Sequence, residues 1–192
     1  MGDLVLFLIW PAWFLAGAAF VLVFLRCVGT TAQPIQPGLP VCALMPCALW
    51  NAYERLWYER MFPEKVRLAG TLAIGGLSAS FGGGGGCGIA AFWLDPATRD
   101  DIGRQGLAFF RDAHEAAGGE RRTYTPWAAT PMPKGTFAEG GWYGLDCADL
   151  GRGLRNAIYH GAQQPGGFFA RGSSRDLLVL PAAGIAAFVY YH

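Results

Sequence analysis

The sequence predicts a mainly α-helical integral membrane protein with two to three transmembrane helices, an interfacial amphipathic helix and a long loop-rich polar segment. Of its 192 residues, 53% are hydrophobic and only 15% are charged, against roughly a quarter charged in soluble domains. The stretches Leu4–Leu25 and Leu68–Leu94 contain no charged residue, and Leu177–Tyr191 is a third apolar stretch. These observations favour a lipid environment for much of the chain.

Residues 1–27 are predicted to form the first transmembrane helix. The apolar run Leu4–Leu25 has 22 residues, which as a helix reach about 33 Å and can cross a hydrocarbon core of about 30 Å. The run is longer than the apolar part of a secretion signal, and Asp3 is the only early charge. We therefore expect a retained anchor.

Residues 28–66 are expected to form a proline-rich connection followed by an amphipathic helix in the membrane interface. Between Cys47 and Phe62, apolar side chains recur at helical spacing and charged side chains take the other face. Aromatic side chains suit the depth of lipid headgroups. The predicted interfacial anchors are Trp50, Tyr53, Trp57 and Tyr58. An amphipathic helix packed on a partner protein explains the pattern equally well.

Residues 67–94 are predicted to form a glycine-rich second transmembrane helix. In a bilayer the backbone has no water to bond, so helix is favoured, and small residues let helices approach closely. The predicted helix-packing residues are Gly70, Gly75, Gly82, Gly86 and Gly88. The same run matches the G-x-G-x-x-G nucleotide pattern, but a five-glycine run matches it easily, and the pattern requires a preceding strand and a following soluble helix, which a membrane span does not supply. We expect no nucleotide site there.

Residues 95–176 are expected to form a polar, loop-rich region outside the membrane. A helix is predicted over Pro96–Ala117, capped by Asp95 and stopped by Gly118, and a short helix over Cys147–His160. Aliphatic residues are too few here to suggest an independent core, so aromatic side chains in glycine- and proline-rich segments are predicted to contact other subunits. These are Trp127, Trp142, Tyr143, Phe168 and Phe169.

Residues 177–192 are predicted to form a third transmembrane helix or a membrane-embedded tail. A helix over the 15 residues Leu177–Tyr191 is about 22 Å long, which is short for a full crossing. A re-entrant or partner-packed tail is the alternative.

Residues with catalytic or metal-binding patterns are sparse, and we expect no catalytic, cofactor or metal site. His114 and Glu115 lack the second histidine of a zinc motif. The apolar runs Leu4–Leu25 and Leu68–Leu94 contain no Asp, Glu, Lys, Arg or His for a proton or ion path. One group of residues has the composition of a thiol nucleophile with acid–base partners, but we favour the interpretation that they are solvated polar residues of loops. It comprises Asp146, Cys147, Asp149 and His160.

The five cysteines are an odd number, which excludes a complete disulfide framework. A Cys42–Cys47 or a Cys42–Cys147 disulfide is possible, but reduced, buried cysteines are favoured.

These patterns predict a non-catalytic, accessory structural subunit of a large membrane protein complex. The expected setting is a respiratory-chain or ATP synthase complex of the mitochondrial inner membrane, with a thylakoid or bacterial membrane as alternatives. Expected partners are other subunits and membrane lipids, with structural phospholipids in place of cofactors. A formal net charge of +1, without a basic cluster, argues against nucleic acid. The alternative function is a small stand-alone membrane enzyme or lipid-handling protein.

Overall fold

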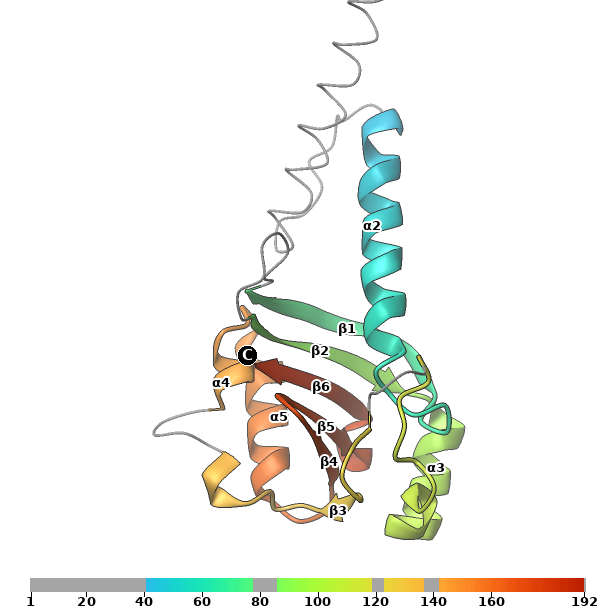
Figure 1. The fold of residues 1–192 in the computed structure, drawn as a ribbon, viewed down its shortest axis with the longest axis vertical. Coiled ribbons are helices and arrows are strands. Elements are labelled where there is room, and N and C mark those ends of the chain that lie inside the picture. The colour runs from blue at the N-terminus through green and yellow to red at the C-terminus, as the bar shows by residue number, and fades with distance from the viewer. Residues whose placement is uncertain (1–40, 78–85, 119–122, 137–141, 192) are drawn as a thin grey trace, which may run out of the picture. The chain divides into compact units, whose positions relative to one another are not determined.

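The computed structural model describes residues 41–77, 86–118, 123–136 and 142–191. The chain divides into two compact units, Met1–Glu54 and Arg55–His192. The described part of the first unit belongs to helix α2 (Val41–Glu59), whose C-terminal end lies in the second unit. The second unit contains a β-sheet (Figure 1). The predicted first transmembrane helix lies outside the described residues.

The sheet of the second unit has six strands, all antiparallel, in the order β1-β2-β6-β5-β4-β3 (Figure 1). Strands β1 and β2 form one ladder and strands β4 and β5 another, and β6 joins the two ladders at the centre. The strands are β1 (Leu68–Leu77), β2 (Cys87–Leu94), β3 (Ala128–Ala129), β4 (Phe168–Gly172), β5 (Arg175–Leu180) and β6 (Ile185–Tyr191).

The helices differ in part from those predicted. Helix α2 covers most of the predicted Cys47–Phe62 helix but begins earlier, and α5 lies a few residues later than the predicted Cys147–His160 helix. The described short helices are α3 (Pro96–Gln105), α4 (Tyr143–Asp146) and α5 (Arg152–Gln163), with the 3₁₀ helices η1 (Gly106–Phe110), η2 (Lys134–Thr136) and η3 (Pro181–Ala183).

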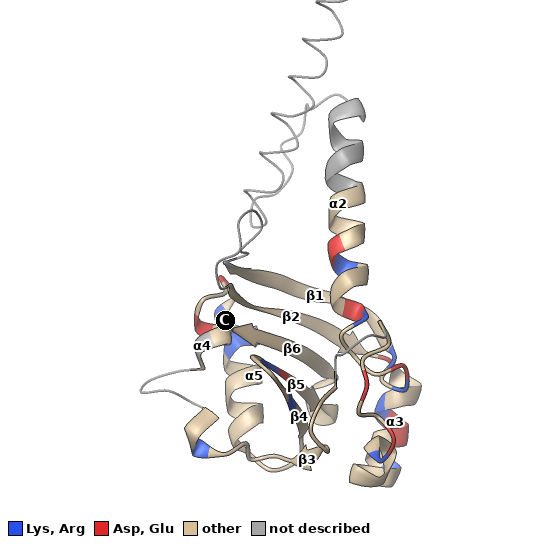
Figure 2. Cartoon of the chain, viewed as in Figure 1, with Lys and Arg blue, Asp and Glu red and all other residues tan. Residues whose placement is uncertain are grey.

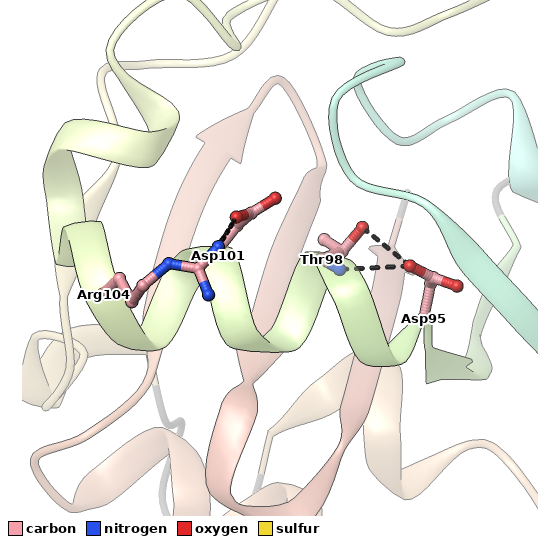
Figure 3. Close-up of polar contacts among 4 residues, drawn as sticks. All are labelled: Asp95, Thr98, Asp101 and Arg104. Carbon is pink, nitrogen blue, oxygen red and sulfur yellow. Dashed lines mark hydrogen bonds and ion pairs between the residues drawn. The ribbon is translucent and has the colours of Figure 1, made fainter.

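The predicted start of α3 is confirmed. An Asp95 carboxylate oxygen accepts a hydrogen bond from the Thr98 backbone N–H at 3.1 Å (Figure 3). Pro96 occupies the first turn of the helix. On the exposed side of the helix, Arg104 pairs with Asp101 one turn earlier (Figure 3). The α-helix ends at Gln105, earlier than predicted, where Gly106 has a positive φ of 55°.

Both faces of the sheet are buried by the chain's own side chains. On the first face, Phe92 of β2, Val179 of β5 and Phe188 of β6 pack with residues from the end of α2, from α3 and from η1. On the second face, the alternate residues of the same strands, such as Leu178 and Val189, pack with residues of α4 and α5. Successive residues of each central strand therefore enter different cores.

This two-sided burial corrects the predicted fold class. The stretch 67–94, predicted as a glycine-rich transmembrane helix, forms β1 and β2, and the stretch 177–192, predicted as a third span or tail, forms most of β5 and β6. A half-exposed strand alternates apolar and polar residues, whereas a strand buried on both faces is apolar throughout. Strands β2, β5 and β6 are of this kind, and the partly buried β1 is uncharged as well. Consecutive strands of this composition resemble one long apolar helix, because the polar alternation is missing.

None of the helices in the described part of the chain is long and apolar enough to cross a membrane. The predictions of an integral membrane protein and of a mitochondrial inner-membrane, thylakoid or bacterial membrane location relied on the three spans. The second and third predicted spans contain β-strands, so both predictions are wrong.

Candidate functional site

The most unusual polar group of the described residues is Asp176, at the start of β5, whose side chain is fully buried. Its register partners are Arg171 on β4 and Val189 on β6. The Arg171 Nε lies 3.7 Å from a carboxylate oxygen of Asp176, and the Arg171 guanidinium also contacts the Thr136 hydroxyl. The strand alternation places Asp176 on the same face as Leu178, so it borders the second core.

Burial controls the protonation of Asp176. Loss of water raises the pKa of this carboxyl above its ordinary value of 3.8. The charge of Arg171 and the polar groups of Trp142 and Tyr191 act in the opposite direction and reduce this rise in pKa. Neither carboxylate oxygen has a partner within strict hydrogen-bond geometry among the described residues, which explains why desolvation dominates.

The raised pKa of Asp176 predicts a pH-dependent stability. Protonation stabilises the folded state, so the contribution of this carboxyl is fully present below about pH 3.8 and is lost as the pH rises through the folded pKa. Asp176→Asn cannot ionise. We expect the free energy of unfolding of this variant, relative to the native chain, to increase with pH, by about 1.4 kcal/mol for each unit by which folding raises the pKa.

Urea denaturation between pH 3.5 and pH 8 measures this difference. Asp176→Ala is the control, because it also removes the titrating group but loses the side-chain contacts. It should be less stable than Asp176→Asn at every pH and show the same change in pH dependence. A difference between native chain and Asp176→Asn that stays constant with pH would contradict the assignment.

Cys147 forms a disulfide with Cys87, with their Cα atoms 6.1 Å apart. The two disulfides considered from the sequence did not include Cys87, because residues 60 positions apart are brought together only by the fold. Cys87 is the register partner of Tyr191 on β6, so the disulfide attaches the segment after α4 to the same end of the sheet as Asp176.

The disulfide removes the nucleophile from the imagined catalytic group. A thiolate is required for attack, and the sulfur of Cys147 is bonded to that of Cys87. Asp146 is exposed, and its carboxylate oxygen Oδ1 lies 3.6 Å from the Arg155 guanidinium nitrogen Nη1. His160 is exposed on α5. The expectation of a non-catalytic chain stays a prediction.

The glycines predicted to pack helices lie in or beside the β1–β2 ladder, except Gly82, which is outside the described residues. Gly70 and Gly75 are in β1, Gly86 precedes β2, and Gly88 is in β2. A Cβ at Gly88 would lie 2.6 Å from the Tyr190 hydroxyl and 2.5 Å from the Gly75 carbonyl oxygen. Gly88 is therefore needed because β1 and Tyr190 approach its backbone closely, whereas the prediction was close approach between two helices.

The aromatic residues predicted at subunit contacts mostly belong to the chain's own cores. Trp127, Trp142 and Phe169 are buried, and the half-buried Phe168 packs against the first core. Phe110 and Trp127 stack with ring centres 4.2 Å apart. Of Tyr143 only the backbone is described, in α4. The polar region therefore contributes aromatic side chains to the chain's own cores, where they pack on one another and with the apolar strands.

The predicted interfacial anchors are divided between two environments. Tyr53 and Trp57 are exposed and Trp50 is half-buried, whereas Tyr58 is buried and its hydroxyl donates a hydrogen bond to that of Tyr190 at 3.1 Å. Exposed large apolar side chains are concentrated on α2. They are Leu49, Tyr53, Leu56 and Trp57, compared with Trp93 and Leu107 elsewhere in the described residues.

Two open hollows lie on the second unit. One, of about 410 Å³, is lined partly by Arg99, Arg104 and Pro181, and the other, of about 360 Å³, partly by His114 and Trp127. No group of three or more potential metal ligands occurs among the residues that the structure describes. Neither hollow contains the buried Asp176.

Comparisons with protein-family models, with curated proteins and with solved structures found no match to this chain.

Proposed function

We propose that this chain is a non-catalytic structural component of a protein assembly, and that an α-helix of a partner protein packs on the apolar face of α2. We name this face the α2 stripe; it consists of Leu49, Tyr53 and Leu56, with Trp57 at its margin. Its exposure is the single observation that carries the proposal. The exposed fractions are 67% for Leu49, 61% for Tyr53 and 52% for Leu56.

The spacing of the stripe is that of a helix-packing surface. Leu49, Tyr53 and Leu56 are related as i, i+4 and i+7, which places them within about 60° of arc on one α-helix. Tyr58 is about 160° from Leu56 on the same helix, and it is Tyr58 that packs on the core residues Phe188 and Tyr190. The side of α2 that carries the stripe is therefore not the side used for the chain's own core.

Polar residues border the stripe. Arg55 and Glu59 form an ion pair of 2.7 Å on the exposed surface of α2. An apolar centre with a charged rim is the usual organisation of a protein interface, and an amphipathic helix recognises such a surface through anchors at i, i+3, i+4 and i+7. Single exposed apolar residues are common, but three successive turns of them indicate a contact surface.

The test uses the full-length tagged chain at native expression level, analysed by native gel and mass spectrometry. We expect the native chain in an assembly of fixed stoichiometry, and Leu49→Ser/Leu56→Ser released from it with an unchanged unfolding midpoint. Leu107→Ser is the matched control, because Leu107 is 44% exposed but lies on η1; it should remain assembled.

Two outcomes would contradict the proposal. The native chain migrating alone would favour a stand-alone protein, and the double variant remaining in the assembly would place the contact elsewhere.

A further inference from the structure

Strand β1 is an edge of the sheet. Among the described residues its only strand neighbour is β2, so its outer side presents backbone N–H and C=O groups that another strand can pair with. β1 contains 10 residues, which as a strand extend about 33 Å. The binding partner that fits such an edge is a polypeptide segment in an extended conformation.

This edge has few of the features that prevent strand addition. Charged residues and proline commonly protect an edge strand. Leu68–Leu77 contains no charged residue (Figure 2) and, by its sequence, no proline. The opposite edge of the sheet is protected differently, because β3 has only 2 residues. The register between β1 and β2 shifts at Leu68/Gly70 and at Thr71/Ala73, and it is regular from Ala73 to Leu77. A regular ladder keeps the second half of β1 suitable as a template.

The strand is also held in place by packing on both faces. Ile74 packs against the first core, and Leu72 and Ala73 pack against the second. At Gly75 a Cβ would lie 3.5 Å from the Ala148 Cβ, so the segment after α4 lies close to the strand there. An edge supported in this way loses little conformational freedom when a further strand is added.

We propose that β1 pairs antiparallel with β1 of a second copy of this chain, centred on the regular segment Ala73–Leu77, and so extends the sheet across a two-fold axis. Antiparallel self-pairing uses the same residues in both copies and needs no other partner. Because the strand is uncharged, no like charges would face each other. This inference goes beyond the proposed function and is independent of α2.

The test measures deuterium uptake and molar mass of the full-length chain over a range of concentrations. We expect a dimer, with peptides covering 68–77 exchanging more slowly as concentration rises and peptides covering α5 unchanged. Thr71→Lys, at an exposed position on β1, should weaken dimerisation roughly tenfold or more. Thr123→Lys is the matched control at an exposed position outside the named strands and should leave the dimer intact.

Three outcomes would overturn the proposal. The chain could be monomeric at every concentration, or dimeric with unchanged affinity in Thr71→Lys. Residues 68–77 could also be equally protected at all concentrations, which would mean that the chain covers its own edge. Leu49→Ser/Leu56→Ser should not change this dimer, so failure here is distinguishable from failure of the α2 contact.

Discussion

Removal of the Cys87–Cys147 disulfide is expected to lower the free energy of unfolding by about 4 kcal/mol. The bonded cysteines are 60 positions apart, so the cross-link restricts a large loop of the unfolded chain, and its loss restores that conformational entropy. Urea denaturation of Cys87→Ser/Cys147→Ser against the native chain under non-reducing conditions measures the change.

The single variants Cys87→Ser and Cys147→Ser serve as controls for the substituted side chains. If the cross-link is the main contribution, each single variant should lose about as much stability as the double variant. A reducing agent should destabilise the native chain much more than the double variant. Equal stability of the native chain and the double variant would show that these cysteines are not joined in the folded protein.

Phe92→Ala is expected to lower the free energy of unfolding by about 3 to 5 kcal/mol. Phe92 is fully buried in β2 and meets the edge of Phe62, with ring centres 5.8 Å apart. The substitution removes this contact and leaves a cavity in the first core. Chemical denaturation gives the difference directly.

Trp93→Ala is the matched control, because Trp93 is the next residue along β2 and is 49% exposed. Its Cδ1 lies 3.9 Å from where a Cβ at Gly70 would be, so its ring lies over β1 at a position without a side chain. We expect a loss of less than about 1.5 kcal/mol. A larger loss for Trp93→Ala than for Phe92→Ala would contradict the register of β2.

Local features were predictable where adjacent residues decide the structure. Asp95 and Pro96 start a helix because a carboxylate accepts the unpaired N–H groups and proline needs no donor there. The amphipathic pattern of α2 also predicted a helix, since helical periodicity is visible within a few turns. The end of α3 was less predictable, because helical spacing continues beyond Gly106, and only the structure shows that this glycine has the positive φ of 55° at which the α-helix ends.

The sheet was mispredicted because its strands β2, β5 and β6 are buried on both faces, and because the partly buried β1 is also uncharged. Residues 68–94 and 177–191 have the composition of membrane helices, and neither contains the polar alternation of a half-exposed strand. Burial on the second face depends on α4 and α5, and the buried residues Ile158 and Ala162 of α5 belong to the same core as Ile89 of β2, which is distant in sequence. Hydropathy measures how apolar a segment is, but not which surroundings remove it from water.

The buried carboxyl of Asp176 and its contact with Arg171 were not predicted, for a related reason. Asp176 borders an apolar stretch and suggests a helix end near lipid headgroups, whereas in the strand it lies beside Arg171 and is fully buried. Its position in the alternation with Leu178 becomes meaningful only when the segment is known to be a strand. Cys87 and Cys147 show the same dependence, because nothing near either cysteine in sequence identifies its partner.

The start of α3 and the apolar face of α2 can be read from neighbouring residues, because capping and helical periodicity act within a few turns. The pairing of the apolar segments from residue 68 onward as strands, the Cys87–Cys147 disulfide and the burial of Asp176 are visible only in the folded chain. Each of these depends on pairing between residues far apart in the chain. Such pairing is selected by the complementarity of whole surfaces, and no short window of sequence contains both partners.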